Sequence, residues 1–370
     1  MSELDKTLQD VERIIRTYCV LPSDEHYTAV TLWVAASHLS SEWTCQPRLI
    51  IKAPSKGCGK TRLGEVVTEL SLCGAELVAP TPAVLYRMID TAWDVDYPPT
   101  LFFDEVQEIW KQYRKNSESA GQIFAVMKAG FAASAKVPRC VGTSNKIHLF
   151  RAACMMVLAG IGDMPDEIES RGVVIRMRKL GPGEQVKPFR EPDKPDLAKV
   201  SETLSEVLAG LDRSEPDIPV HDRPADVWEP LLTIASMAGG LWPSRGKIAC
   251  LKLTEEFKAD DDDRSRVVTL LRDIRTVFTE ARVTSMHTKW LIAGLLDLDD
   301  SPWEDWHYKP TGLAKDLSQF SIKSHGIKID GENRNGYRLD QFADAFARYL
   351  PVDPVDSTDD LGSTSETLAA

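Results

Sequence analysis

Residues 53–63 read APSKGCGKTRL and lie between an apolar stretch and a helical pattern. The letters GKT (59–61) match the end of the pattern G-x-x-x-x-G-K-[ST], whereas Pro54 stands at its first glycine. The preceding RLIIKA (48–53) predicts a buried strand, and TRLGEVVTELSL, which begins at Thr61, predicts a helix. A strand that enters a glycine-containing loop and then a helix is typical of a phosphate-binding site in an α/β fold.

In that geometry, the backbone N–H groups of residues 56–61 point at a phosphate, and the helix N-terminus adds to the attraction. Lys60 would bridge the β- and γ-phosphates of ATP, and the Thr61 hydroxyl would bind Mg²⁺. Pro54 removes one N–H donor, but only at the edge of this cradle. The alternative interpretation is a strand-to-helix turn with an incidental lysine. The residues predicted to contact the nucleotide are Lys56, Gly57, Cys58, Gly59, Lys60, Thr61 and Arg62.

A pair of acids ends the apolar stretch TLFFDE (100–105). An aspartate at the end of a strand beside the loop can hold Mg²⁺ through water, and the adjacent glutamate can orient or deprotonate the attacking water. We therefore expect Asp104 to be a metal residue and Glu105 to be the catalytic base. Such a strand is common by itself, but it is informative when it follows a phosphate loop.

The stretch RCVGTSN (139–145) predicts the next strand of the sheet, with a polar end. A polar side chain there would lie between the two acids and the γ-phosphate and would help to position the water. Asn145 is the predicted catalytic residue, with Thr143 and Ser144 as alternatives. The competing interpretation is that Asn145 only caps a turn.

Two arginines further along the chain are candidates for phosphate contacts. Arg171 ends a short acidic helical pattern before an apolar strand, where an arginine can stabilise the transferred phosphoryl group of a neighbouring subunit. Arg176 and Arg178 on that strand are alternatives, and a plain salt bridge is the structural interpretation of Arg171. Arg223, in HDRPADVW (221–228), begins a helix from which it is predicted to touch the γ-phosphate.

Strands and helices alternate through the first half of the chain. Helices are expected over 5–19 and 25–39, and further strands over 75–80, 155–161 and 172–178. This alternation predicts an α/β fold with a parallel sheet and helices on both faces. The predicted domains are the N-terminal helices with the phosphate-loop core (1–180), a linker (181–196), a helical lid (197–260), a winged-helix domain (264–350) and a disordered acidic tail (351–370).

Four consecutive aspartates, Asp260–Asp263, precede the last domain and are expected to form a solvated turn that caps the next helix, with a metal site as the alternative. Three helical patterns and then GIKIDGENRNGYRL (326–339), two strands joined by a turn, follow in the order of a winged helix. Such a domain inserts a helix in a DNA groove and lays its wing on the backbone. The predicted DNA-binding residues are Lys315, Lys323, Lys328, Arg334 and Arg338.

The basic excess in this domain is modest, so weak DNA binding by each subunit and, alternatively, protein contacts both remain open. The aromatic group of Trp303, Trp306, His307 and Tyr308 is expected to pack in a core or against the lid rather than to stack on bases. A net charge of −12 argues against a protein covered with basic residues, although it is compatible with a local basic face.

Composition also bears on localisation. The 7 cysteines occur singly and form no C-x-x-C pair, which indicates reduced thiols in the cytoplasm rather than a disulfide framework or a zinc site. The charged N-terminus does not resemble a signal peptide, and no apolar run approaches the roughly 20 residues that span a bilayer.

The segments GCGKT (57–61), LFFDE (101–105), GTSN (142–145) and ESR (169–171) together resemble the AAA+ group of P-loop ATPases. LAGIGDMPDEIESRGVVIRMRK, DRPADVWEPLLTIASMAGGLWP and GYRLDQFADAFARYL are similar to a family of phage, plasmid and actinobacterial ATPases often labelled helicase- or primase-associated. The resemblance implies an ATP- and Mg²⁺-dependent homo-oligomer, expected to be a hexameric ring, that acts with replication proteins on mobile DNA.

The resulting hypothesis is a motor that couples ATP hydrolysis to work on DNA as a helicase, a translocase or a helicase loader. Two alternatives belong to other classes. One is an ATP-gated DNA-binding regulator or assembly factor with little turnover, and the other is a defence ATPase that acts on protein partners.

Overall fold

The structure is a computed structural model that describes residues 2–141, 146–162, 164–298, 303, 308–329 and 331–350, with the backbone alone for 260–266. The chain divides into two compact units, Met1–Phe257 and Lys258–Ala370. Each unit is described by itself.

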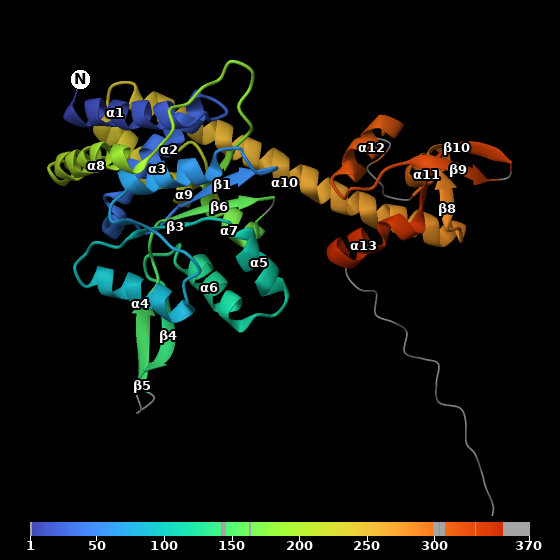
Figure 1. The fold of residues 1–370 in the computed structure, drawn as a ribbon, viewed down its shortest axis with the longest axis horizontal. Coiled ribbons are helices and arrows are strands. Elements are labelled where there is room, and N and C mark those ends of the chain that lie inside the picture. Colours follow the sequence, from blue (N-terminus) through green and yellow to red (C-terminus); the bar gives the residue numbers. More distant parts are fainter. Residues whose placement is uncertain are drawn as a thin grey trace, which may run out of the picture. The chain divides into compact units, whose positions relative to one another are not determined.

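A five-stranded parallel sheet forms the centre of the first unit, in the order β2-β3-β6-β1-β7 (Figure 1). Along β1, Leu49 and Ile51 join one buried apolar cluster, whereas Ile50 joins a second cluster on the opposite face. Because successive side chains point to opposite faces, both faces of this sheet are covered, and the predicted α/β class is confirmed. The strands are β1 (Arg48–Ala53), β2 (Gly74–Glu76), β3 (Thr100–Phe103), β6 (Met156–Ile161) and β7 (Gly172–Arg176).

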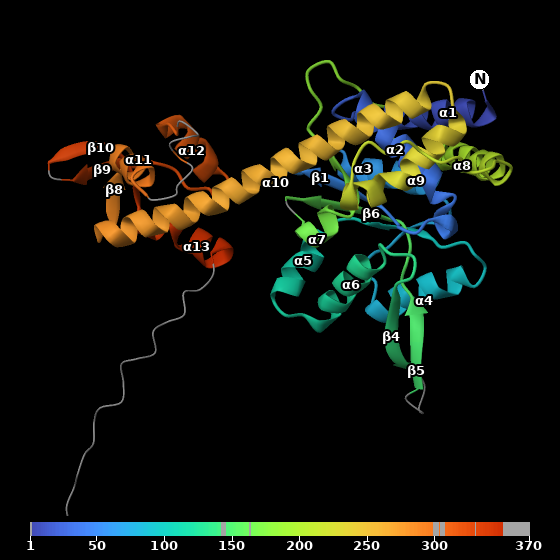
Figure 2. The ribbon, with the colours of Figure 1, turned by 180° about the vertical axis from the view of Figure 1, so that it is seen from behind.

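Helices pack on both faces of this sheet, as the views from the front and from behind agree (Figures 1 and 2). The first apolar cluster contains α1 (Glu3–Tyr18), α2 (Asp24–Ser37), α3 (Lys60–Leu70), α8 (Lys194–Ala209), α9 (Asp222–Ala238) and the first turns of α10 (Trp242–Ala281). The second contains α4 (Pro82–Trp93), α5 (Gln107–Arg114), α6 (Glu118–Ala129) and α7 (Asp166–Glu169). Short 3-10 turns lie at Ser40–Glu42 and Glu191–Asp193.

One predicted strand of the parallel sheet is absent from it. β4 (Lys136–Val141) pairs antiparallel with β5 (Lys146–Arg151) in a separate two-stranded sheet beside α4, so the expectation that residues 139–141 lie in the parallel sheet was wrong. The place between β3 and β1 belongs to β6, whose first five residues are all buried, whereas buried and exposed residues are mixed along β4. A central parallel strand needs apolar residues on both faces, and only β6 meets that need.

The run of aspartates does not form the predicted turn. Asp260–Asp263 lie within α10, which continues from Trp242 to Ala281. No proline or glycine follows Gly246 within that helix, so no residue that readily breaks a helix interrupts it. The side chains of the four aspartates lie outside the described residues.

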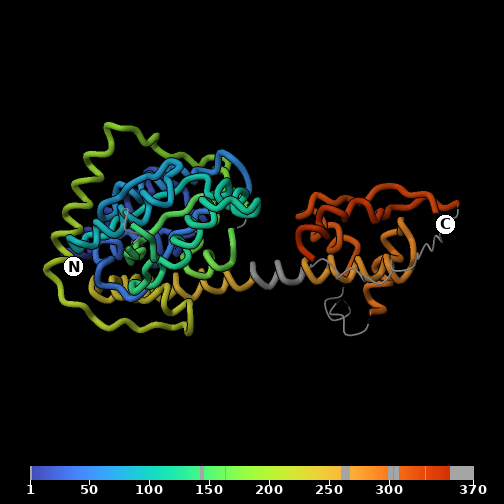
Figure 3. Tube along the Cα trace, turned by 90° about the horizontal axis from the view of Figure 1, so that it is seen from below, coloured from blue at the N-terminus to red at the C-terminus, as the bar shows by residue number. Residues whose placement is uncertain are grey.

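The second unit combines the last turns of α10 with a three-stranded sheet in the order β8-β10-β9. Figure 3 follows its chain from orange to red. Within the sheet, β9 pairs antiparallel with β10. This is the element order predicted for a winged helix, and Trp303 is fully buried in its core, as expected. The elements are β8 (Ser285–His287), α11 (Thr288–Leu296), α12 (Pro310–Ser318), β9 (His325–Ile329), β10 (Glu332–Arg338), a 3-10 turn (Leu339–Phe342) and α13 (Ala343–Tyr349).

All seven cysteines are free. Over the parts of the chain that the structure describes, none of the helices has both the length and the apolar character needed to cross a membrane.

A buried histidine makes the stability of the first unit depend on pH. His38 donates from Nε2 to the Leu70 carbonyl at 2.9 Å, while its Nδ1 lies 2.7 Å from Ser205 Oγ. Burial lowers the pKa of His38 to about 4, although the Leu70 carbonyl opposes this effect. Between these two pKa values the unfolded chain binds more protons than the folded chain does. The free energy of unfolding therefore decreases as pH falls from about 6.5 to about 4.

We expect His38 to account for a loss of about 2 kcal/mol in the free energy of unfolding between pH 7.5 and pH 5. Urea unfolding at both pH values checks this for the wild type and for His38→Gln, which keeps a donor and an acceptor but does not titrate. The variant should lose correspondingly less stability over this interval. Equal losses in the two proteins would contradict the assignment.

Candidate nucleotide-binding site

The phosphate loop connects the carboxyl end of β1 to the start of α3. Gly57 and Gly59 have φ angles of 80° and 79°, in the left-handed region that a side chain disfavours. A Cβ atom at Gly59 would make only an ordinary contact, at 3.6 Å from the Met177 Cε, so the φ angle is what favours glycine there. Pro54 is exposed at the start of the loop and does not prevent these turns.

The loop presents donors that have no acceptor among the described residues. For the backbone N–H groups of residues 56–61, no hydrogen bond is found within the described part of the chain. Lys60 is only 8% exposed, and its amine likewise has no carboxylate partner among the described residues. A buried ammonium group and several N–H groups at a helix N-terminus are satisfied by an anion. These residues therefore fit a phosphate group.

The two predicted metal residues are in direct contact. Thr61 Oγ1 donates to Asp104 Oδ2 at 2.6 Å, although the two residues come from different elements. They meet because β1 and β3 are parallel, so the residues that follow them lie at the same edge of the sheet. A hydroxyl and a carboxylate are the oxygen donors that Mg²⁺ prefers. The pair fits a magnesium ion bound at the phosphate loop.

Glu105 has an unusual backbone conformation. Its φ of 51° lies in the left-handed region, and its N–H donates to Asp104 Oδ1 at 2.8 Å. A residue with a Cβ in this region is strained by about 1–2 kcal/mol, and such strain often marks functional sites. The Glu105 side chain is exposed beside the metal pair, so it is accessible to a water molecule.

The other predicted loop residues have different environments. Lys56 is exposed, whereas Cys58 is buried in the apolar cluster with its Sγ 3.8 Å from Ser55 Oγ. Arg62 Nε lies 3.8 Å from a Glu65 carboxylate oxygen one turn further along α3. Cys58 thus contributes backbone and packing, and the Arg62 side chain is directed along its own helix.

Sequence reasoning missed one polar residue at this edge. Gln107 accepts a hydrogen bond from the Ile161 N–H through Oε1 at 3.1 Å, which places its amide at the carboxyl end of β6. This is the position that the sequence analysis expected for Asn145, which lies outside the described residues, as do Thr143 and Ser144. Gln107 lies near the site only because β6 is beside β3, and no local pattern indicates that pairing.

Arg171 lies at the opposite edge of the sheet. Its carbonyl accepts from the N–H of Arg48, the first residue of β1, and its guanidinium donates to the Glu167 carbonyl. The phosphate loop follows the last residue of β1, about 17 Å away for a six-residue strand. The structure therefore does not bring Arg171 to the nucleotide site of its own subunit.

Of the two alternatives to Arg171, Arg178 is exposed and donates to both carboxylate oxygens of Glu184. These hydrogen bonds hold the pKa of Arg178 above its ordinary value. Arg176 is half-buried on β7. Both lie on or just after β7, as expected from the sequence.

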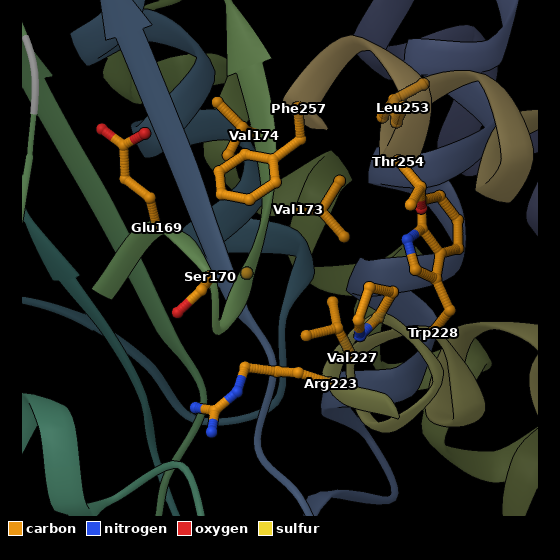
Figure 4. A pocket seen from close by; sticks show the side chains of 12 residues that line it. Glu169, Ser170, Val173, Val174, Arg223, Val227, Trp228, Leu253, Thr254 and Phe257 are labelled. Carbon is orange, nitrogen blue, oxygen red and sulfur yellow. The ribbon is translucent and has the colours of Figure 1, made fainter. Parts of the chain in front are cut away.

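Arg223 lies far from the phosphate loop of its own subunit. It lines a pocket with Ser170 and Gly172, which flank Arg171 at the amino edge of the sheet (Figure 4). The loop lies at the other edge, so the predicted contact of Arg223 with a γ-phosphate stays a prediction. The sequence correctly indicated a helix start at this residue but carried no information on which edge that start approaches.

The predicted DNA-binding residues are all exposed in the second unit. Arg334 pairs with Glu332, and Arg338 pairs with Asp340, each at 2.8 Å. Asp316 is buried and accepts a hydrogen bond from the Tyr308 hydroxyl at 2.7 Å. The other three predicted DNA-binding residues are exposed lysines that have no carboxylate partner among the described residues, namely Lys315, Lys323 and Lys328.

The sheet order, the glycine turns and the contact between Thr61 and Asp104 together define an α/β protein of the P-loop type. A model of the family described as "Protein of unknown function (DUF3631)" matches residues 176–349. The "Uncharacterized 28.9 kDa protein in xis 5'region" of Saccharopolyspora erythraea is 38% identical over 191 residues, which cover 49% of this chain and 71% of that protein. The chain belongs to the family of this Saccharopolyspora protein.

Two solved structures show a distant likeness to this chain. The apo C-terminal region of NrS-1 is 10% identical, with a TM-score of 0.35 over 90% of this chain and 75% of that one. The ORC2 protein of Aeropyrum pernix, solved as ADPNP-ADP complexes, is 10% identical, with a TM-score of 0.30 over 89% of this chain and 93% of that one.

Proposed function

We propose that this protein is a Mg²⁺-dependent ATPase whose active sites are shared between subunits and which acts on DNA. The contact between Thr61 Oγ1 and Asp104 Oδ2 carries the proposal, because it places both expected metal residues beside a loop with unsatisfied donors. The buried Lys60 amine adds the positive charge that a triphosphate requires.

Each residue of the site has a defined task in this proposal. The loop N–H groups and Lys60 bind the phosphates, and Thr61 and Asp104 hold Mg²⁺. The ion, when bound, neutralises charge on the phosphate oxygens. Glu105 accepts the proton of the attacking water, and the hydrogen bond from its N–H to Asp104 sets the direction of its backbone. The Gln107 amide, anchored through Oε1, is placed to orient that water.

We further propose that the active form is a homo-oligomer, expected to be a hexameric ring, that serves replication or maintenance of mobile DNA. The position of Arg171 supports a shared site, because it lies about one strand length from the loop of its own subunit. The exposed lysines of the second unit supply weak DNA contacts, which several subunits in one assembly strengthen by avidity.

The proposal is tested by ATP turnover of the purified protein with and without single-stranded DNA, combined with mass measurement in both states. We expect Mg²⁺-dependent hydrolysis that DNA stimulates, and an oligomer with an ATP analogue. ATP-dependent DNA binding with negligible hydrolysis would favour the regulator. Absence of DNA binding in every nucleotide state would favour action on a protein partner.

Mixing two inactive variants tests the shared site. Arg171→Ala subunits keep an intact phosphate loop, and Lys60→Ala subunits keep an intact arginine. Random mixing in equal amounts should restore roughly a quarter of the wild-type ATPase rate, because about one interface in four then combines both intact halves. The rate is measured across mixing ratios. No rise above the separate variants at any ratio would contradict a shared site.

A further inference from the structure

A second arginine lies beside Arg171 at the amino edge of the sheet. Arg223 and Ser170 line the same pocket of about 80 Å³, and Ser170 directly precedes Arg171. The inner wall of this pocket is apolar and includes Val227 and Trp228 of α9. Figure 4 shows the Arg223 guanidinium turned away from that wall and toward the side on which Ser170 lies. The pocket therefore fixes the base of Arg223 and leaves its charged end at the opening.

Neither of these arginines has a carboxylate partner among the described residues. Arg171 donates to the Glu167 carbonyl, while the Glu167 carboxylate lies 3.7 Å from the Lys128 amine. Arg223 is exposed and is engaged in no ion pair or hydrogen bond within that part of the chain. The first N–H groups of α9, which has no side-chain cap, add the positive end of the helix dipole.

Arg48 increases the positive charge at this edge. It is fully buried, and its guanidinium donates to the carbonyls of Gln46, Cys154 and Met127 without a carboxylate partner in the described chain. Burial lowers the pKa of Arg48 to about 10, and burial followed by the charge of Arg223 lowers the pKa of Arg171. Arg48 and Arg223 thus both act on Arg171, whereas Glu167 raises the pKa of Arg171. The acids at this edge have lysine partners: Glu167 lies 3.7 Å from Lys128, and the buried Glu169, which also lines the pocket, pairs with Lys52 at 2.8 Å. The arginine charge that remains favours an anion at the opening.

We propose that Arg171 and Arg223 together form one anion site that binds the terminal phosphate of ATP held by the phosphate loop of a second copy of this chain. This inference rests on the proposed function. The inference assigns Arg223 to the nucleotide of the neighbouring subunit. Arg223 shares the amino edge of the sheet with Arg171 and lies about one strand length from the phosphate loop of its own subunit. Two guanidinium groups supply more donors to phosphate oxygens than one, and they hold the phosphate from two directions.

The decisive experiment mixes variants in pairs and measures ATPase rates. Arg223→Ala alone should lower the rate by about 10- to 100-fold, which corresponds to the loss of a charge-assisted hydrogen bond. Mixed with Lys60→Ala subunits, Arg223→Ala should regain activity, because the Lys60→Ala subunit supplies both arginines to an intact loop. If Arg223 served the nucleotide of its own subunit, no site in this mixture would combine an intact Lys60 with an intact Arg223, and the rate would not rise. Absence of rescue here would overturn the proposal.

A second mixture has the opposite expected result. In a mixture of Arg171→Ala with Arg223→Ala, every interface lacks one of the two arginines if both act from the same edge, so the rate should not rise. Rescue in this mixture would show that the two arginines serve different nucleotides and would also overturn the proposal. Arg87→Ala, which removes an exposed arginine from α4, is the matched control and should keep the wild-type rate.

Two further measurements separate this inference from related explanations. If Arg171→Ala is rescued by Lys60→Ala but Arg223→Ala is not, the proposed function stands and the inference about Arg223 fails.

DNA supplies the same phosphate chemistry, so the affinity for single-stranded DNA is measured by anisotropy for the wild type and Arg223→Ala. We expect equal affinities. Weaker DNA binding with an unchanged ATPase rate in the absence of DNA would assign Arg223 to nucleic acid instead.

Discussion

Lys60→Ala is expected to abolish ATP binding at concentrations that saturate the wild type, with a loss of affinity of about 100-fold or more. The Lys60 amine is buried at the start of α3 and has no carboxylate partner among the described residues, so a phosphate group is the anion that it lacks. Its removal leaves the loop N–H groups in place but takes away the only lysine charge buried in the loop. Binding of a fluorescent ATP analogue measures the effect.

Lys111→Ala is the matched control for this experiment. Lys111 is an exposed lysine of α5 that pairs with Glu108 at 2.7 Å, and its loss should leave ATP affinity unchanged. If Lys60→Ala bound the analogue as tightly as Lys111→Ala does, the segment at 54–59 would be a turn between strand and helix and not a phosphate loop.

Glu105→Gln is expected to bind ATP with nearly unchanged affinity but to hydrolyse it about 100- to 10,000-fold more slowly. The amide cannot accept the proton of the attacking water, whereas the shape of the side chain and the hydrogen bond from its N–H to Asp104 remain. The variant should therefore accumulate as a complex with unhydrolysed ATP. Single-turnover hydrolysis and retention of labelled ATP measure the two effects separately.

Glu108→Gln provides the comparison, because Glu108 is an exposed glutamate on the next turn of the chain that pairs only with Lys111 among the described residues. It should hydrolyse ATP at the wild-type rate. Hydrolysis by Glu105→Gln at the rate of Glu108→Gln would remove Glu105 from the role of base and leave the proton to another group at the same edge.

Local sequence determined the phosphate loop and the strands that surround it. The apolar RLIIKA forms β1 over the predicted residues, and the glycines at 57 and 59 adopt the left-handed conformation that the loop requires. Asp104 meets Thr61 because both follow parallel strands, and the parallel arrangement itself follows from alternating strands and helices. These features depend on short stretches of chain or on a rule that holds throughout the fold class.

Tertiary packing decided the features that sequence reasoning missed. The stretch 139–145 has the composition of a strand, but the choice between the separate two-stranded sheet and the central sheet depended on whether both of its faces are buried, and only β6 satisfies that condition. The aspartate run looked like a turn, yet α10 continues through it because no residue breaks the helix. Gln107 reaches the site only through the pairing of β3 with β6.

The position of Arg223 illustrates the same limit for function. Its sequence context predicts the start of a helix, and α9 begins at Asp222 as that pattern indicates. The edge of the sheet at which this start lies depends on how some forty residues between β7 and α9 cross the molecule, and no local pattern carries that information. The sequence by itself therefore determined which groups are suited to bind a phosphate, because that depends on the chemistry of each side chain. Only the tertiary structure decided which groups share one edge, because long-range packing sets the distances between them.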